Sequence, residues 1–338
     1  MLRIGWKASA EQFEPRRLVE YAVLAEELGY DSVVVSDHFH PWRHDGGHSP
    51  FSFAWLAAVG ERTSRIALGT SVVAPAYRYH PAIVAQAMAT LGVLYPQRVF
   101  LGVGTGEALN EIPLGVEWPE QRVRFQMLKE ACTLMKRLWR EERVTFEGEF
   151  FRTDRATIYD RPEEPIPLYI AASGPAAARL AGRIADGFIT TSGKDPALYA
   201  EKLLPAVGEG IEKEGRSPED VELVLEVKAS FDQGLTRAQE DTRLWGALAL
   251  TPEEKVGVDD PIEMQRRADA LPVERTVTRW IASDDPEHHV SALLEYVELG
   301  FSHLVLHFPG DDQERALRGY RDHVLPLLRS KPAASIGP

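Results

Sequence analysis

Short runs of β-branched and apolar residues alternate with helix-like patterns along the whole chain, and this alternation limits the possible folds more than any other feature. Such alternation is typical of βαβ units and a parallel sheet. The runs at residues 66–70 and 98–103 are continuously apolar, as expected of strands covered on both faces. Eight runs are predicted to be strands: 2–6, 31–36, 66–70, 98–103, 166–171, 187–190, 221–227 and 304–306. Eight strands with helices between them predict an α/β protein with a (β/α)8 TIM barrel.

Helix starts are marked by capping residues. Glu14 precedes Pro15, and the apolar residues that follow recur at helical spacing until Gly29. Asp285 and Pro286 form a similar start near the end of the chain. A polar cap followed by proline, with glycine at the far end, predicts a helix at each place.

We expect a single domain spanning residues 1–338. Length alone suggests about two domains, but α/β barrels of this size commonly fold as one unit. Residues 229–280 interrupt the alternation between the seventh and eighth predicted strands with acidic, loop-like sequence. We interpret this segment as an insertion on the barrel.

Composition and charge argue against several classes of partner. The chain has 38 Lys and Arg against 51 Asp and Glu, a formal net charge of −13, whereas nucleic-acid binding needs clustered cations. No apolar run approaches the ~20 residues that span a bilayer, and the chain begins with a strand pattern and not a signal peptide. The single cysteine, Cys132, cannot form an intrachain disulfide. We therefore expect a cytoplasmic protein with no nucleic-acid or membrane partner.

Functional groups of such a barrel lie at the carboxyl ends of the strands. Asp37 and His38 follow the second predicted strand and suit proton transfer or the orientation of a cofactor. Glu107 follows the fourth strand after a glycine-rich turn and is a candidate acid or base, and Lys194 follows the sixth and can receive an anion. Trp42 fits either stacking on a ligand ring or packing beneath its loop. Each group also fits an ordinary solvated loop, so spacing leaves the choice open.

A metal site is a weaker alternative. Four histidines lie between positions 38 and 48, and His38 and His40 have the alternating spacing of barrel metallohydrolases. Such a site needs further ligands from later strands, but no histidine occurs between His80 and His288. We therefore expect no metal.

At these same positions the sequence closely resembles the F420-dependent glucose-6-phosphate dehydrogenases, which belong to the luciferase-like barrel superfamily. The resemblance covers nearly the whole chain. It is carried by KASAEQF at 7–13, VSDHF at 35–39 with PWRH at 41–44, LYP at 94–96, RVFLGVGTGEALNEI at 98–112 and DDPIEM at 259–264. These long identities are far more specific than a glycine pattern, and they imply a luciferase-like barrel that binds the deazaflavin coenzyme F420.

The resemblance also implies which positions contact the coenzyme. The peptide between Ser71 and Val72 is typically cis in the superfamily. Ala74 is a departure, since the family commonly has a threonine there, and the lost hydroxyl would weaken coenzyme binding by about 0.5 to 1.5 kcal/mol. The implied coenzyme-contacting positions are Asp37, Ser71, Val72, Ala74, Thr105, Gly106, Asn110, Ser173, Gly174, Ala176 and Ala177.

For the substrate, the resemblance implies oxidation of glucose 6-phosphate at C1 to the lactone, with hydride passing to the coenzyme. His38 would take the hydroxyl proton, or else only hydrogen-bond the hydroxyl, while Glu107 protonates the coenzyme ring. Trp42 would line the sugar and the ring. The implied phosphate and sugar contacts are Thr191, Lys194, Lys255 and Arg279.

Two other functions remain open at this point. One keeps the coenzyme but acts on another sugar phosphate, and the other is a deazaflavin-binding protein without turnover. Family members are usually homodimers, so the resemblance also implies a homodimer.

Overall fold

The structure is a computed structural model that describes residues 2–331. Eight parallel strands follow one another round a closed barrel in the order β9, β11, β1, β2, β3, β4, β7, β8, and pairing of β8 with β9 closes it. The predicted (β/α)8 barrel is confirmed. Its strands are β1 Arg3–Ala8, β2 Ser32–Val35, β3 Ala67–Thr70, β4 Val99–Val103, β7 Leu168–Ala171, β8 Gly187–Thr191, β9 Glu222–Phe231 and β11 His303–His307.

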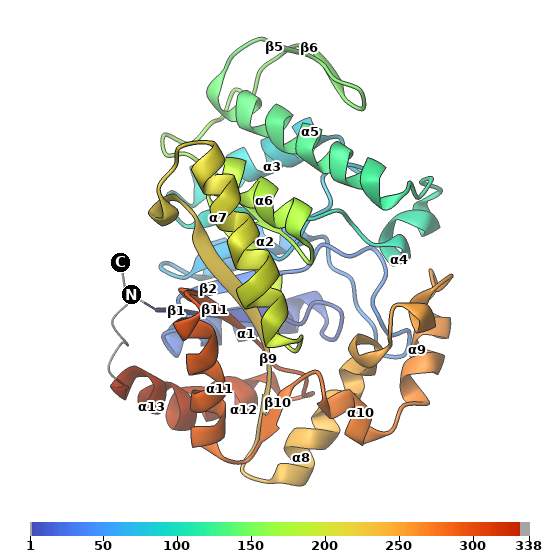
Figure 1. Ribbon diagram of the computed structural model, residues 1–338, viewed down its shortest axis with the longest axis vertical. Coiled ribbons are helices and arrows are strands. Elements are labelled where there is room, and N and C mark those ends of the chain that lie inside the picture. Colours follow the sequence, from blue (N-terminus) through green and yellow to red (C-terminus); the bar gives the residue numbers. More distant parts are fainter. Residues whose placement is uncertain (1, 332–338) are drawn as a thin grey trace.

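Helices surround the barrel (Figure 1). The predicted caps are confirmed, because the side chain of Glu14 accepts from the backbone N–H of Arg17 and that of Asp285 from Glu287. The helices are α1 Pro15–Glu27, α2 Ser52–Arg62, α3 Pro81–Leu94, α4 Ala108–Glu111, α5 Gln121–Arg140, α6 Pro175–Ile184, α7 Leu204–Lys213, α8 Leu235–Glu240, α9 Pro261–Asp269, α10 Val273–Val277, α11 Pro286–Glu298, α12 Gln313–Gly319 and α13 Leu325–Ser330.

Two excursions leave the barrel. The first is an antiparallel hairpin, β5 Val144–Glu147 with β6 Arg152–Ala156, which lies at the opposite end of the molecule from α8, α9 and α10 (Figure 1). The second runs from the end of β9 through α8, α9 and α10 to the short strand β10, Ile281–Ser283, which pairs with β9. β9 continues to Phe231, so the first residues of the predicted segment 229–280 are strand.

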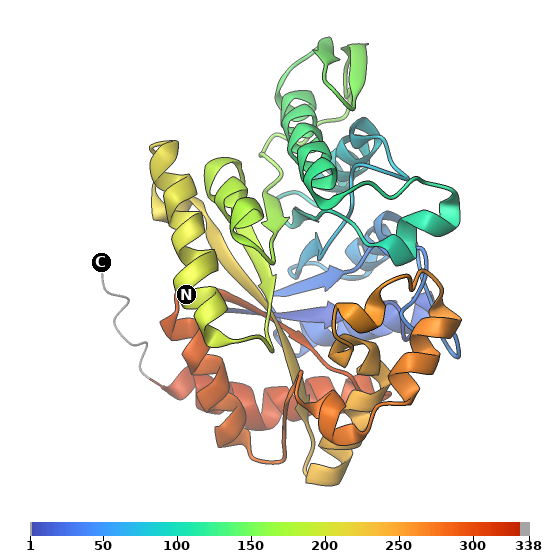
Figure 2. The same ribbon diagram turned by 45° about the vertical axis from the view of Figure 1, so that its right-hand side comes forward.

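The second excursion has an apolar cluster of its own, to which α9 contributes Met264 and Ala268. Trp42, from the loop after β2, packs against this cluster. Figure 2 shows the blue strands near the N-terminus pointing toward the orange helices of this segment. The excursion therefore covers part of the carboxyl end of the barrel.

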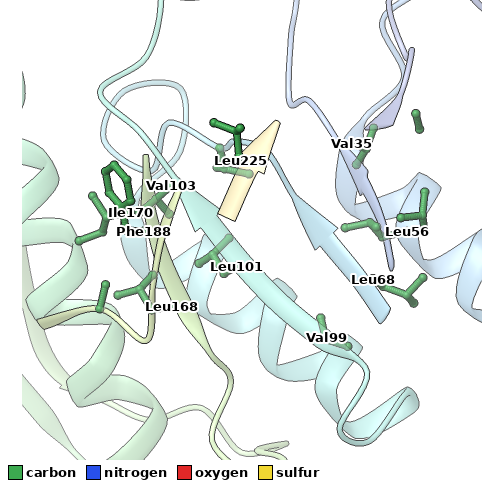
Figure 3. Packing of buried hydrophobic residues seen from close by; sticks show 14 of the residues in the cluster. Val35, Leu56, Leu68, Val99, Leu101, Val103, Leu168, Ile170, Phe188 and Leu225 are labelled. Atoms are coloured by element: carbon green, nitrogen blue, oxygen red, sulfur yellow. The ribbon is translucent and has the colours of Figure 1, made fainter. Parts of the chain in front are cut away.

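Alternate residues of each strand face opposite sides. Val99, Leu101 and Val103 of β4 pack with the helices in the main core, as Figure 3 shows from close by, whereas Phe100 belongs to a separate cluster inside the barrel. On β9, Val224 belongs to the inner cluster, whereas Leu225 and Val227 belong to the main core. The same alternation directs Glu226 and Lys228 into the barrel.

The two ends of the barrel interior differ. At the amino end, Arg3 Nη1 lies 2.9 Å from Glu222 Oε1, and Ser32 Oγ lies 2.7 Å from His303 Nε2. Phe100 and Tyr169 stack above them with ring centroids 5.0 Å apart. These groups fill the lower half, so the open space lies at the carboxyl ends of the strands, where barrel enzymes place their sites.

Candidate active site

A cavity of about 380 Å³ lies at the carboxyl ends of the barrel strands. This volume falls within the range of small-molecule sites. Most of the residues proposed from the sequence line it, although they come from six different strand-to-helix connections or excursions. These are Asp37, His38, Trp42, Ser71, Val72, Ala74, Thr105, Gly106, Glu107, Asn110, Ser173, Thr191, Lys194, Lys255 and Arg279.

Three predicted coenzyme positions do not line this cavity. Gly174 is the N-cap of α6, and Ala176 and Ala177 lie in the first turn of that helix. They follow Ser173, which does line the cavity, and Ala176 is exposed. Any contact that they make with a ligand must therefore involve a part of it that extends beyond the cavity.

His38 lies between two carboxylates. Its Nδ1 is 2.6 Å from Glu11 Oε1, and its Nε2 is 3.9 Å from Glu107 Oε2. Exposure of the side chains rises along this row, from 4% for Glu11 through 16% for His38 to 45% for Glu107. A carboxylate against Nδ1 orients the ring and leaves Nε2 toward the cavity, as in other acid–imidazole pairs.

The electrostatics of this row follow from the Glu11–His38 contact. Burial alone would raise the pKa of Glu11, but the imidazole of His38 outweighs it and lowers that pKa to about 2. Burial likewise opposes a charge on His38, yet the carboxylate of Glu11 raises the pKa of the imidazole above its ordinary value. Each of the two groups thus favours the charged form of the other.

Replacing Glu11 with glutamine is expected to destabilise the fold by about 1.5 to 3 kcal/mol, the value of a hydrogen bond to a charged group. The lowered pKa of Glu11 contributes folding stability that is present above pH 4.5 and is lost as the pH falls toward 2. The raised pKa of His38 contributes folding stability that is present below pH 6.5 and is lost as the pH rises through that raised pKa. The difference in folding stability between the wild type and the Glu11 variant should therefore be largest between about pH 4.5 and 6.5. Thermal melts of both proteins across pH 4 to 9 measure it. A difference in melting temperature that does not vary with pH would contradict the ion pair.

Asp37 is held rigidly in the cavity wall. Its Oδ1 accepts from Ser52 Oγ at 2.6 Å and from Tyr79 Oη at 3.3 Å, and its Oδ2 pairs with the guanidinium of Arg78. Asn110 Oδ1 accepts from the backbone N–H of Phe39 at 2.8 Å. Both residues thus position the loop after β2, and the amide N–H₂ of Asn110 is the group left to meet a ligand.

One wall of the cavity consists of small side chains. The Ser71–Val72 peptide is cis, as the resemblance implied. Gly106 has a φ of +78°, and a Cβ there would lie 3.1 Å from the Cβ of Ala74. The remaining small residues of this wall are Gly104, Ala171 and Ala172. Backbone and small side chains form most of this surface, which fits the face of a flat ring.

Three predicted cations gather on another side. Gly193 has a φ of +73°, and a Cβ there would lie 2.7 Å from the carbonyl oxygen of Arg279, so the loop carrying Lys194 touches the backbone of Arg279. Lys255 Nζ lies 4.6 Å from the ring centroid of Trp42. Among residues 2–331, no carboxylate lies within ion-pair distance of Lys194, Lys255 or Arg279. Burial lowers the pKa of Lys194 and of Lys255.

Several further polar residues line the same cavity and are not among the site residues predicted from the sequence. Lys7 from β1, Glu226 and Lys228 from β9 and His307 from β11 all face inward, and Glu11 lies beneath His38. Their signal was present in the sequence: polar residues at alternate positions of otherwise apolar strands point to one face.

The described part of the chain offers no metal site and no membrane span. No group of three or more His, Cys, Asp or Glu side chains in residues 2–331 is arranged to hold a metal ion. No helix in that range has the length and apolar character needed to cross a bilayer.

Comparison with known proteins identifies the class. The family model described as luciferase-like monooxygenase matches residues 2–303. The chain therefore belongs to the luciferase-like monooxygenase family. Two curated relatives bear the name F420-dependent glucose-6-phosphate dehydrogenase. The one from Nakamurella multipartita is 61% identical over 97% of each chain, and the one from Microbacterium testaceum is 59% identical over 98% of each.

A solved structure shares the fold closely. It is an F420-dependent secondary alcohol dehydrogenase in complex with an F420-acetone adduct. It is 35% identical, covers 97% of this chain and 99% of its own, and superimposes with a TM-score of 0.91.

Proposed function

We propose that the protein is an F420-dependent glucose-6-phosphate dehydrogenase, which oxidises C1 of glucose 6-phosphate to 6-phosphogluconolactone and yields reduced F420. One observation carries the proposal: three cations, for which residues 2–331 provide no carboxylate partner, face the same cavity as the His38–Glu107 pair. The names of the two curated relatives support it. An oxidoreductase with an anion-binding end and a proton-transfer end fits a phosphorylated alcohol.

The coenzyme would rest on the wall of small residues. Val72, Ala74 and Gly106 leave room for a planar ring, and Asn110 offers its amide at the edge. When bound, the deazaflavin supplies the acceptor for the hydride that leaves C1. The predicted contacts of Gly174, Ala176 and Ala177 would then fall on the part of the coenzyme that extends past Ser173 toward α6.

The substrate phosphate would bind Lys194, Lys255 and Arg279, with Thr191 beside them. Each charge-assisted hydrogen bond of this kind contributes about 1.5 to 3 kcal/mol. Because Lys255 lies over the ring of Trp42, the phosphate and the indole position the sugar from adjacent sides. The cations also offset, locally, the net charge of −13.

Two proton movements accompany oxidation of the alcohol. His38 Nε2 faces the cavity and takes the C1 hydroxyl proton, while Glu11 on the other ring nitrogen stabilises the imidazolium that results. The carboxylate of Glu11 raises the pKa of His38, which makes the neutral imidazole a stronger base. Glu107, exposed at the cavity, holds the proton that the reduced coenzyme requires.

Mixing purified protein, F420 and glucose 6-phosphate tests the proposal. Absorbance of the oxidised deazaflavin should fall only when both ligands are present. No loss of absorbance would overturn it. A panel of other sugar phosphates and of secondary alcohols tests the second candidate, an F420-dependent alcohol dehydrogenase, which the 35% identical structure suggests. The three cations that line the cavity favour the phosphorylated substrate.

We also propose that the protein is a homodimer that functions in the cytoplasm. An apolar groove runs between α1 and α2 and is lined by Val19, Trp55 and Phe51, whose side chain is 54% exposed. A second copy would cover it. Sedimentation should give twice the chain mass, and Phe51→Glu should shift the protein toward the monomer by at least about tenfold in dissociation constant. A wild-type protein that sediments as a monomer would contradict this.

The single, buried thiol of Cys132 agrees with a reducing compartment.

A further inference from the structure

Lys228 lines the active-site cavity but has no part in the function described above. It lies near the carboxyl end of β9 and, by the alternation of that strand, points into the barrel. Only 3% of the residue is exposed. A nearly buried ammonium is unfavourable unless hydrogen-bond acceptors surround it.

Among the residues that the structure describes, Lys228 lacks those acceptors. In residues 2–331, Nζ of Lys228 makes no hydrogen bond, and its one ion-pair contact is Glu226 Oε1 at 3.9 Å. Glu226 is already engaged through its other oxygen, which lies 3.3 Å from Lys7 Nζ and 3.3 Å from Ser71 Oγ. The three N–H donors of Lys228 are therefore left to a ligand in the cavity.

The position of Lys228 places it beside the phosphate-binding cations. Its backbone N–H donates to Ser192 Oγ at 2.9 Å, in the loop that carries Lys194. The adjacent residue Ala229 pairs with Ile281, two positions after Arg279. Burial lowers the pKa of Lys228 to about 8; Glu226 opposes this, whereas the charges of Arg279 and Lys194 add to it.

Like charges that face one cavity repel one another unless an anion lies between them. A phosphate monoester carries up to two negative charges and three acceptor oxygens, and three oxygens can accept from more groups than Lys194, Lys255 and Arg279. A sugar hydroxyl would satisfy a donor of Lys228 but would not relieve the repulsion. The charge balance therefore favours the phosphate.

We propose that Lys228 is a fourth cation of the substrate-phosphate site, binding the phosphate from the barrel floor while the other three bind it from the rim. The proposal rests on the proposed function for the identity of the phosphate ester. The anion-binding role itself is independent of turnover, so it can be measured without the coenzyme.

The test uses calorimetric titration of the full-length protein with inorganic phosphate, followed by steady-state kinetics with F420 and glucose 6-phosphate. Lys228→Met removes the charge and retains most of the length of the side chain. Lys213→Met is the matched control, because Lys213 is exposed at the end of α7. We expect K228M to weaken phosphate binding about tenfold or more and to raise KM for glucose 6-phosphate by a similar factor, with a smaller change in kcat. K213M should match the wild type in both.

Several results would overturn the proposal. One is that the wild type does not bind phosphate. Another is that K228M binds phosphate with unchanged affinity; if its KM for glucose 6-phosphate were nevertheless raised, Lys228 would contact the sugar and not the phosphate. If K228M does not fold, Lys228→Arg replaces it. This variant keeps the charge and should bind phosphate with an affinity within about threefold of the wild type. A loss of phosphate affinity above tenfold would count against Lys228 as a phosphate-binding cation. Phosphate binding that depends on Lys228 in a protein that does not oxidise glucose 6-phosphate would support the cation role while refuting the proposed function.

Discussion

Glutamine in place of Glu107 is expected to lower kcat for glucose 6-phosphate oxidation at least about 100-fold, the smallest effect usual for losing a positioned acid or base. The amide has the shape of the carboxyl group but cannot hold or release a proton at neutral pH. Glu107 sits at the N-cap of α4 without a capping hydrogen bond from its side chain, so the exchange leaves that turn intact. Steady-state turnover of F420 measures the loss.

The same variant should bind F420 within about threefold of the wild type, because the wall of small residues is unchanged. Fluorescence titration of the protein with the coenzyme checks this. Glu212→Gln on the exposed surface of α7 is the control for a lost carboxylate elsewhere. If affinity and turnover of the Glu107 variant fell by the same factor, the residue would be a binding group and its assignment in proton transfer would be wrong.

Methionine in place of Arg279 is expected to lower kcat/KM for glucose 6-phosphate by about 10- to 100-fold, mostly through KM. A lost charge-assisted hydrogen bond of about 1.5 to 3 kcal/mol corresponds to that range. No carboxylate in residues 2–331 forms an ion pair with Arg279, so the substitution leaves no buried partner behind and the fold should remain stable. Kinetics with varied sugar phosphate give the measurement.

Arg65→Met is the matched control, because Arg65 is an exposed residue just before β3, at the amino ends of the strands. The kcat/KM of this control for glucose 6-phosphate should stay within about twofold of the wild-type value. An Arg279 variant with wild-type KM would show that the cations do not hold the phosphate, and the substrate would then have to be sought among uncharged alcohols.

The strands were predictable because both faces of each are buried, which produces short apolar runs of unmistakable length. Helix α2 was not predicted: its N-cap, Phe51, makes no side-chain capping bond, and nothing in the preceding loop marks the start. The β5–β6 hairpin was missed because β5 alternates over only four residues, β6 is an exposed, charged run without alternation, and a register shift interrupts the pairing.

The site shows the same limits. His38, Glu107 and Lys194 were candidates from position alone, since each follows a predicted strand. For Lys255 and Arg279, in the segment after the seventh predicted strand, spacing left open whether they join Lys194 at an anion site or are surface charges, and only the resemblance favoured the anion site. The contact between Glu11 and His38 joins two strand-end loops, and only tertiary structure reveals it.

The excursion between β9 and β10 carries both Lys255 and Arg279 and has its own small apolar cluster, whereas the wall of small residues belongs to the barrel proper. Two of the cations proposed to recognise the oxidised compound are thereby encoded in a stretch of sequence that carries none of the surface proposed to receive the redox partner. Exchange of that contiguous piece of gene would alter this part of substrate selection and leave the electron-accepting half unaltered.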